Sequence, residues 1–284
     1  MKYLEKNLSI GVNGIIVSYT DNGNAGYPFL IFIHGFPFNK SMWNIQMEAL
    51  KDNFHMISYD VRGHGNSEAG NVDFSIELFV NDLIGFMDIL KIDKAVLCGL
   101  SMGGYISLNA VSKFPERFDA LILSDTHCIA DTPETKEKRM LAIKNIRKDG
   151  VEKYADESIK NLFAPESFIT RKKEIANVRE MIIKTSEKSL CNTLLALSGR
   201  KETCSKLNEI KVPVLIMAGK EDKLTPPAAA QLMHEKIKDS FLNIIDHAGH
   251  LSNIENPDEF NFQLKKFVSA IYLRPFHSGK TIED

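Results

Sequence analysis

Short apolar runs bounded by turn residues alternate with segments of helical periodicity along most of the chain. This alternation is typical of a doubly wound, mostly parallel β-sheet with helices on both faces. Asn13-Gly14 is a strong hairpin signal between the first two predicted strands. The later runs are rich in Ile, Val, Leu and Phe, as expected of strands buried on both faces. The predicted strands are 8–12, 15–19, 29–33, 55–59, 95–98, 120–123, 214–218 and 243–245.

Three amphipathic segments fit between these strands as helices. The segment 75–90 begins with Ser75, whose hydroxyl can accept a hydrogen bond from the first turn. The segment 102–114 stops directly before Pro115, and 226–237 opens with two prolines, which suit a first helical turn.

The pattern changes between residues 130 and 199, which are helical in period, highly charged and without a strand candidate. A helical insertion here predicts a cap over the C-terminal edge of the sheet, where ligands of open α/β sheets bind. We therefore expect one α/β core from 1–129 and 200–284, with 130–199 as the cap. The segment 274–284 should be loose. The expected inner face of the cap consists of Leu162, Phe163, Phe168, Leu190, Leu194, Leu195 and Leu197.

The composition narrows the choice of partners. The 284 residues include 35 basic and 37 acidic residues, for a net charge of -2, and the two signs are well mixed along the chain. This mixture favours neither nucleic acid nor an anionic membrane as a partner. No apolar run reaches the roughly 18 residues of a membrane span, and the first ten residues lack a signal-peptide core. We expect a monomer or a homodimer.

The metal-binding and redox side chains are dispersed. Cys98, Cys128, Cys191 and Cys204 form no CxxC pair, so we expect structural thiols in a reducing compartment, which predicts a cytoplasmic location. The eight histidines show no ligand spacing such as HExxH. The sequence therefore predicts no metal and no cofactor.

The strongest local motif is Gly99-Leu100-Ser101-Met102-Gly103, directly after the strand 95–98 and before a helix. A nucleophilic serine on a tight strand-to-helix turn needs small neighbours two positions away, and glycine supplies that room. The motif predicts Ser101 as a catalytic nucleophile.

A serine hydroxyl needs a base within hydrogen-bond reach, and the base needs an acid to orient it. In this type of site the chain order is Ser, acid, His. We favour His250 over His247 as the base because Gly249 leaves space for its ring. We favour Asp222, after the strand 214–218, as the acid. Asp125 and Glu221 stay open as alternatives, because the rule fixes only chain order.

The oxyanion needs two preorganised donors. We predict the backbone N–H groups of Met102 and of Phe36, since Pro37 has none. His34 is interpreted as a buried brace of this loop. The expected substrate-binding residues are Gly35, Trp43, Leu162 and Phe163, although Trp43 could equally pack beneath the cap.

At this point the chain resembles the α/β-hydrolase superfamily over nearly its whole length. The segments that carry the resemblance are 34–37, 60–67, 99–104, 219–227 and 248–250. The resemblance implies that Asp60 and His64 belong to a structural loop. Serine at position 101 argues against haloalkane dehalogenases and epoxide hydrolases, which have aspartate there.

Within the superfamily the motifs look most like 3-oxoadipate enol-lactonases and their esterase relatives. This resemblance implies hydrolysis of a small ester or lactone through an acyl-enzyme on Ser101. Two alternatives stay open: hydrolysis of a carbon–carbon bond in a ring-cleavage product, and a small-molecule receptor on the same fold without turnover.

Overall fold

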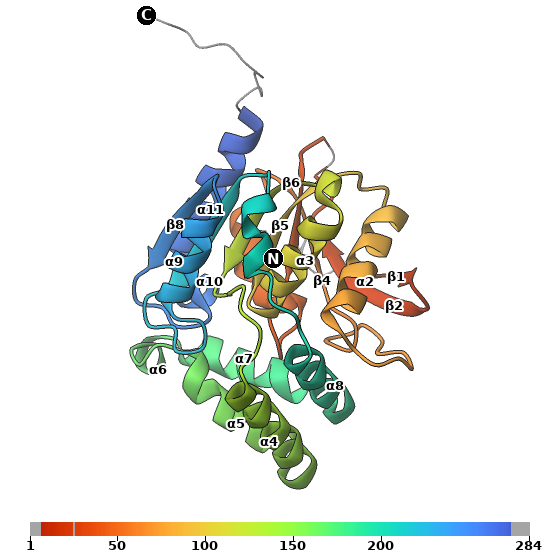
Figure 1. Cartoon of the computed structure of the whole chain (residues 1–284), viewed down its shortest axis with the longest axis vertical. Helices are drawn as coiled ribbons and strands as arrows, with labels where there is room; N and C mark the ends of the chain where they lie inside the picture. Colours follow the sequence, from red (N-terminus) through yellow and green to blue (C-terminus); the bar gives the residue numbers. More distant parts are fainter. Residues whose placement is uncertain (1–6, 25, 274–284) are drawn as a thin grey trace, which may run out of the picture.

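The computed structural model describes residues 7–24 and 26–273, and it contains one eight-stranded sheet (Figure 1). The strand order is β1-β2-β4-β3-β5-β6-β7-β8; β2 is antiparallel to both of its neighbours, and the remaining pairs are parallel. The strands are β1 (Leu8–Val12), β2 (Ile15–Asp21), β3 (Phe29–Ile33), β4 (His55–Tyr59), β5 (Ala95–Leu100), β6 (Phe118–Ser124), β7 (Val214–Gly219) and β8 (Ser240–Ile245).

The predicted strands all fall inside observed ones, which confirms the mostly parallel α/β sheet. The largest difference is β8, which begins at Ser240, three residues before the predicted start at Asn243. This strand forms an edge of the sheet and most of its side chains are only partly buried. Its apolar run is interrupted by Asn243, so the strand lacks the continuous apolar signal of an interior strand.

Helices cover both faces of the sheet. Ser75 caps α2 by accepting a hydrogen bond from the Leu78 amide at 3.0 Å, as predicted. One face carries α2 (Ile76–Ile89), α3 (Met102–Lys113) and α9 (Pro227–Lys236). The other face carries α1 (Asn44–Ala49), α10 (Ser252–Glu255) and α11 (Pro257–Leu273). The short 3-10 segments are η1 (Lys40–Trp43), η2 (Pro115–Arg117) and η3 (Cys204–Glu209).

Alternate residues of the central strands build two core layers. In β3, Ile31 and Ile33 pack with the layer of α2, α3 and α9, whereas Leu30 and Phe32 pack with the layer of α1 and α11. This alternation follows from the two-residue period of a strand. All four side chains are 0% exposed, so the central sheet is buried on both faces.

Five consecutive helices lie together at one end of the molecule, coloured green in Figure 1. They are α4 (Pro133–Asp149), α5 (Val151–Leu162), α6 (Ser167–Thr170), α7 (Lys172–Ile183) and α8 (Glu187–Ser198). They occupy the region predicted as a cap, and we refer to them as the cap helices. The division of the chain into core and cap domains stays a prediction.

Two of the residues expected on the inner face of the cap are not buried. Phe168 is 39% exposed and Leu195 is 44% exposed. On α8 the buried stripe consists of Leu190, Leu194 and Leu197, at the spacing of one helix face, and Leu195 lies off that stripe. Phe168 belongs to α6, which is too short to have a well-defined inner face. The other expected residues are buried.

The cap helices join the core through a covalent and ionic cluster. Cys128, before α4, forms a disulfide with Cys204, after α8, whereas Cys98 and Cys191 are free and buried. The expectation of four free thiols was therefore wrong, because the fold brings together residues 76 positions apart. Asp131 accepts hydrogen bonds from Arg139 and Arg200 beside this bond. The cysteine-based argument for a cytoplasmic location is lost, and that location stays a prediction.

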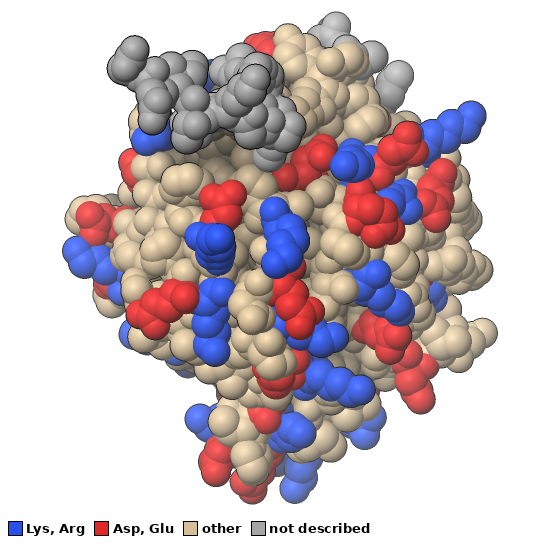
Figure 2. Space-filling model, turned by 45° about the horizontal axis from the view of Figure 1, so that its top comes forward, with Lys and Arg blue, Asp and Glu red and all other residues tan. Residues whose placement is uncertain are grey.

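The surface in Figure 2 carries Lys and Arg side chains interspersed with Asp and Glu, without a large area of one sign on the visible face. No helix of the described ranges 7–24 and 26–273 combines the length and apolarity needed to cross a membrane. The predicted loose segment 274–284 lies outside the described residues.

Candidate active site

Four polar residues follow four neighbouring parallel strands. Ser101 follows β5, Asp125 follows β6, Asp222 lies three residues after β7, and His250 lies five residues after β8. The carboxyl ends of parallel strands meet at one edge of a sheet, so these residues lie at the edge where α/β proteins bind ligands.

Ser101 lies on a strained turn between β5 and α3. Its backbone has φ +53° and ψ -110°, a conformation that a residue with a side chain rarely adopts. A Cβ on Gly99 would lie 2.7 Å from Gly104 N, and one on Gly103 would lie 2.9 Å from Ile33 C. Because both positions lack space for any side chain, the glycines permit the turn that lifts Ser101 out of the sheet.

His250 and Asp222 meet at this edge. His250 Nδ1 lies 2.8 Å from Asp222 Oδ2, and both side chains are almost completely buried. Thr225 donates its hydroxyl to Asp222 Oδ2 at 2.6 Å, while the amides of Leu224 and Thr225 donate to Oδ1 at 2.8 and 3.0 Å. The carboxylate is thus held by three donors besides the imidazole, and Thr225 is a contributor that the sequence analysis did not assign.

The alternative residues are engaged elsewhere. Asp125 accepts the Gly219 amide on Oδ1 at 2.7 Å, and its Oδ2 accepts the hydroxyls of Ser124 and Ser252 at 2.7 and 2.5 Å. The other two alternatives, Glu221 and His247, are exposed on the surface. His247 Nδ1 lies 2.9 Å from Glu166 Oε2. The geometry therefore favours Asp222 as the partner of His250.

Burial and neighbouring charges shift the pKa values of His250, Asp222 and Asp125. Burial disfavours a charged imidazole, but the adjacent carboxylate of Asp222 and its hydrogen bond raise the pKa of His250 above the usual value. Burial likewise opposes ionisation of Asp222, yet His250 and Thr225 hold the pKa of Asp222 below its usual range. Burial and the nearby Asp222 charge raise the pKa of Asp125 to about 7. The pair Asp222–His250 is thus arranged to stabilise an imidazolium.

Ser101 is tied to the same network through its backbone. Its amide donates to Ser124 O at 2.9 Å, and the Ser124 hydroxyl lies 3.4 Å from that of Ser252, two residues beyond His250. Within the described part of the chain the Ser101 hydroxyl makes no hydrogen bond with His250. Such catalytic contacts are often long without substrate and tighten in the reacting complex.

The loop after β3 lies against Ser101. A Cβ on Gly35 would lie 2.9 Å from Leu100 Cδ2 and 3.3 Å from Ser101 Cβ, so the absence of a side chain allows this approach. His34 is fully buried; its Nε2 accepts the Val61 amide at 2.9 Å, and its Nδ1 donates to Gly35 O at 2.8 Å. Burial lowers the pKa of His34 well below the usual value, which fits a neutral structural brace.

Two backbone donors are free at this loop and at the turn. Among the hydrogen bonds of the described residues, the amides of Phe36 and Met102 donate to no protein acceptor. Phe36 lies in the loop that contacts Ser101, and Met102 directly follows Ser101 at the start of α3. Both amides are therefore available to a negatively charged oxygen.

The segment 60–67 acts as scaffold, as the resemblance implies. Asp60 accepts the Lys40 amide and ammonium, each at 2.7 Å, and the Asn66 amide at 2.9 Å. His64 is fully buried, and the Phe36 ring contacts it edge-on with centroids 6.1 Å apart. These contacts hold the loop that carries Phe36.

The expected substrate-binding residues divide into two groups. Leu162 and Phe163 are buried against the histidine loop, where Leu162 O accepts the His250 amide at 2.9 Å. Trp43 lies in the core instead, 0% exposed, with its ring centroid 4.9 Å from that of Phe32 and 6.1 Å from that of Phe260. Its position indicates a packing role, because this face of β3 is covered by α1 and α11.

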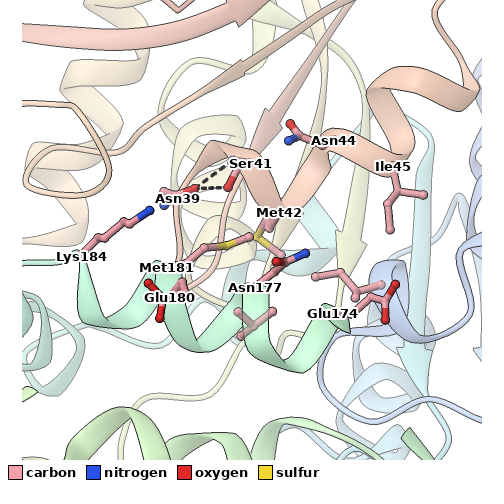
Figure 3. Close-up of a pocket in the computed structure, with 12 residues that line it drawn as sticks. Asn39, Ser41, Met42, Asn44, Ile45, Glu174, Asn177, Glu180, Met181 and Lys184 are labelled. Carbon is pink, nitrogen blue, oxygen red and sulfur yellow. Dashed lines mark hydrogen bonds between the residues drawn. The ribbon is translucent and has the colours of Figure 1, made fainter. Parts of the chain in front are cut away.

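A cleft of about 390 Å³ lies between cap helix α7 and the core segments η1 and α1 (Figure 3). Met42 of η1 and Met181 of α7 both line it, as does Ile254 of α10. Met42 O accepts a hydrogen bond from Asn253 at 3.1 Å, so the cleft borders the segment that follows His250.

The described residues contain no group of three His, Cys, Asp or Glu side chains placed to hold a metal ion.

Comparison with known proteins agrees with this fold. Residues 29–257 match the Hydrolase_4 family, described as serine aminopeptidase, S33. The chain is 32% identical to 3-oxoadipate enol-lactonase 2 of Acinetobacter baylyi, over 87% of this chain and 91% of that protein. The chain therefore belongs to the Hydrolase_4 family of α/β hydrolases.

Two solved structures extend the comparison. A thermophilic esterase from Thermogutta terrifontis superposes with a TM-score of 0.89 at 29% identity, covering 94% of this chain and 99% of that one. The enol-lactonase from Burkholderia xenovorans LB400 gives 0.87 at 28% identity, covering 92% and 100%. The predicted resemblance to enol-lactonases and esterases is confirmed, and with it the enzyme class, a carboxylic-ester hydrolase.

Proposed function

We propose that this enzyme hydrolyses a small carboxylic ester or lactone with Ser101 as nucleophile, His250 as base and Asp222 as the orienting acid. The observation that carries the proposal is the buried 2.8 Å contact between His250 Nδ1 and Asp222 Oδ2, at the same sheet edge as a serine on a strained turn after β5. A carboxylate on Nδ1 fixes the imidazole tautomer in which Nε2 can take a proton.

The reaction proceeds in two halves. Ser101 Oγ attacks the ester carbonyl while its proton passes to His250 Nε2, and the oxyanion accepts hydrogen bonds from the Phe36 and Met102 amides. The imidazolium returns the proton to the leaving alcohol, which leaves an acyl-enzyme. Water, deprotonated by His250, then attacks this acyl group, and the released Ser101 oxygen recovers the proton. A lactone follows the same steps, with the alcohol as part of the product.

The relatives support a small substrate. The named relatives are an enol-lactonase and an esterase. We expect the residues of the cap to determine which acyl and alcohol groups the enzyme accepts.

Hydrolysis of p-nitrophenyl acetate by the wild type and by Ser101→Ala tests the proposal. We expect the variant to lose several orders of magnitude in kcat, because nucleophile and base act as a unit. Ser112→Ala, an exposed serine on α3, is the matched control and should keep the wild-type rate. A fluorophosphonate probe should label the wild type at Ser101 only. Equal turnover by Ser101→Ala and the wild type would refute the assignment.

A further inference from the structure

A third buried carboxylate lies five residues after His250 and is not part of the mechanism proposed above. Glu255, at the end of α10, is 3% exposed. Its Oε1 accepts the amides of Gly249 at 2.8 Å and Leu251 at 3.3 Å, the two residues that flank His250. One carboxylate oxygen therefore holds the backbone on both sides of the proposed base.

The other oxygen of Glu255 binds the cap region. Oε2 accepts the Ala164 amide at 2.7 Å and the Ser167 hydroxyl at 2.6 Å, from the link after α5 and the first residue of α6. The His250 amide itself donates to Leu162 O at 2.9 Å. All three amides from Gly249 to Leu251 are thus bonded either to Glu255 or to the segment that Glu255 binds.

The ionised form of Glu255 fits this position. All four of its partners are donors, and an ionised carboxylate offers about four lone-pair sites and no hydrogen. Burial raises the pKa of Glu255 above its usual value, and the four hydrogen bonds offset this shift only in part. An amide in place of the carboxylate would set its NH2 group against a backbone amide donor, whichever oxygen it replaced. The site therefore favours a carboxyl group over the amide of the same shape.

We propose that Glu255 is a positioning residue for His250, whose carboxylate fixes the backbone of the histidine loop and locks the cap segment 162–167 onto it. The inference rests on the proposed function for its catalytic meaning, since a base must be held within about 0.5 Å of its working position. It makes the placement of the imidazole depend on the contact with the cap segment 162–167. Glu255 is not a catalytic residue, because its oxygens contact only the loop and the cap.

Glu255 also contributes charge near the imidazole. The carboxylates facing His250 are Asp222 from the loop after β7, Asp125 from the end of β6 and Glu255 from α10, and each raises the pKa of His250. His127 is a further titratable group whose field reaches His250. Removing the charge of Glu255 should therefore lower the pKa of His250 as well as loosen its loop.

The test compares Glu255→Gln with the wild type by two readouts. The amide group replaces one carboxylate oxygen, so one pair of donors loses its acceptor. We expect kcat for p-nitrophenyl acetate to fall by about 10²-fold, as for a misplacement of about 1 Å. We also expect the pKa of His250, measured by NMR titration of its ring and assigned with His250→Ala, to shift downward. A residue that only stabilises the fold would lower Tm without moving this pKa.

Two further variants complete the test. Asp258→Asn removes an exposed negative charge three residues further on and should change neither readout. Ser167→Ala removes only one hydrogen bond from the cap side, leaves the charge in place, and should lower kcat several-fold with the His250 pKa unchanged. It also decides the matter if Glu255→Gln does not fold. A folded Glu255→Gln with wild-type kcat and His250 pKa, or a Ser167→Ala with wild-type kcat, would overturn the inference.

The two proposals fail differently. If the wild type has no esterase turnover, the proposed function fails, whereas the NMR titration still decides whether Glu255 holds and charges the histidine loop. If the wild type is active and the titration of His250 is the same in both proteins, only the inference about Glu255 fails.

Discussion

Gly249, directly before His250, gives the sharpest test of the packing around the proposed base. A Cβ at this position would lie 2.7 Å from Ala164 N, 2.9 Å from Phe163 C and 3.1 Å from Leu162 O. All three are backbone atoms, which cannot rotate away as the end of a side chain could. Gly249 does not have a positive φ, so the cost of Gly249→Ala is steric rather than conformational.

The size of the displacement follows from these distances. Ordinary contact of a Cβ begins at 3.4 Å, so a separation of 2.7 Å requires the loop and the cap segment to move apart by about 0.7 Å. The same movement would stretch the bond from the His250 amide to Leu162 O from 2.9 Å to about 3.6 Å, beyond hydrogen-bond length. Because a misplacement of about 1 Å can cost about 10²-fold in rate, we expect kcat to fall by about 10- to 100-fold.

The assay is the turnover of p-nitrophenyl acetate together with thermal unfolding. Overpacking should also lower the free energy of unfolding by about 1–3 kcal/mol. Gly199→Ala is the matched control, because its nearest atoms, the carbonyls of Leu195 and Ala196, are 3.5 and 3.8 Å away, and it should keep the wild-type kcat. If Gly249→Ala retains kcat within about threefold of the wild type, the loop does not hold the base by contact with the cap, and the reasoning is wrong.

Three other predictions concern the acid, the core and the disulfide. The wild-type kcat/KM should fall as pH drops through the raised pKa of His250, because the base must be neutral. Asp222→Asn should move this acidic limb of the pH–rate profile to lower pH and lower kcat by about 10⁴-fold. The control Glu221→Gln, at an exposed residue, should leave the profile unchanged. Trp43→Phe should lower the free energy of unfolding by about 1–3 kcal/mol, and with it Tm, and leave KM unchanged. A large change in KM would show instead that Trp43 lines the substrate pocket. Cys204→Ser should lower the free energy of unfolding in urea by about 2–4 kcal/mol, and wild type treated with reductant should match it; equal stability of oxidised and reduced wild type would contradict this.

The sheet and the helices were predictable because their signals are local. A continuous apolar run marks a strand buried on both faces, and Ser75 or paired prolines mark the start of a helix, whatever the rest of the chain does. The predicted bounds erred mainly at β8, where an edge strand exposes side chains and weakens the signal. The turn at Ser101 is equally local, since Gly99 and Gly103 are needed by residues within the same segment and β3 beside it.

The choice among acids and the surroundings of the base depended on contacts between distant segments. Asp222 and Asp125 both follow neighbouring strands, so chain order could not separate them; the structure shows that Asp125 has its oxygens occupied and Asp222 binds His250. Glu255 carries no local sign of its role, because its partners at Ala164 and Ser167 are about 90 residues away in sequence.

The sequence by itself therefore determined the fold class, the tight turn at Ser101 and the order of the candidate residues, because strand burial and backbone crowding act over a few positions. Only the tertiary structure decided that Trp43 packs in the core, that Cys128 and Cys204 are bonded, and which carboxylates surround His250. These are pairings between segments far apart in the chain, and their geometry exists only once the sheet has aligned its strand ends and the cap has been packed against them.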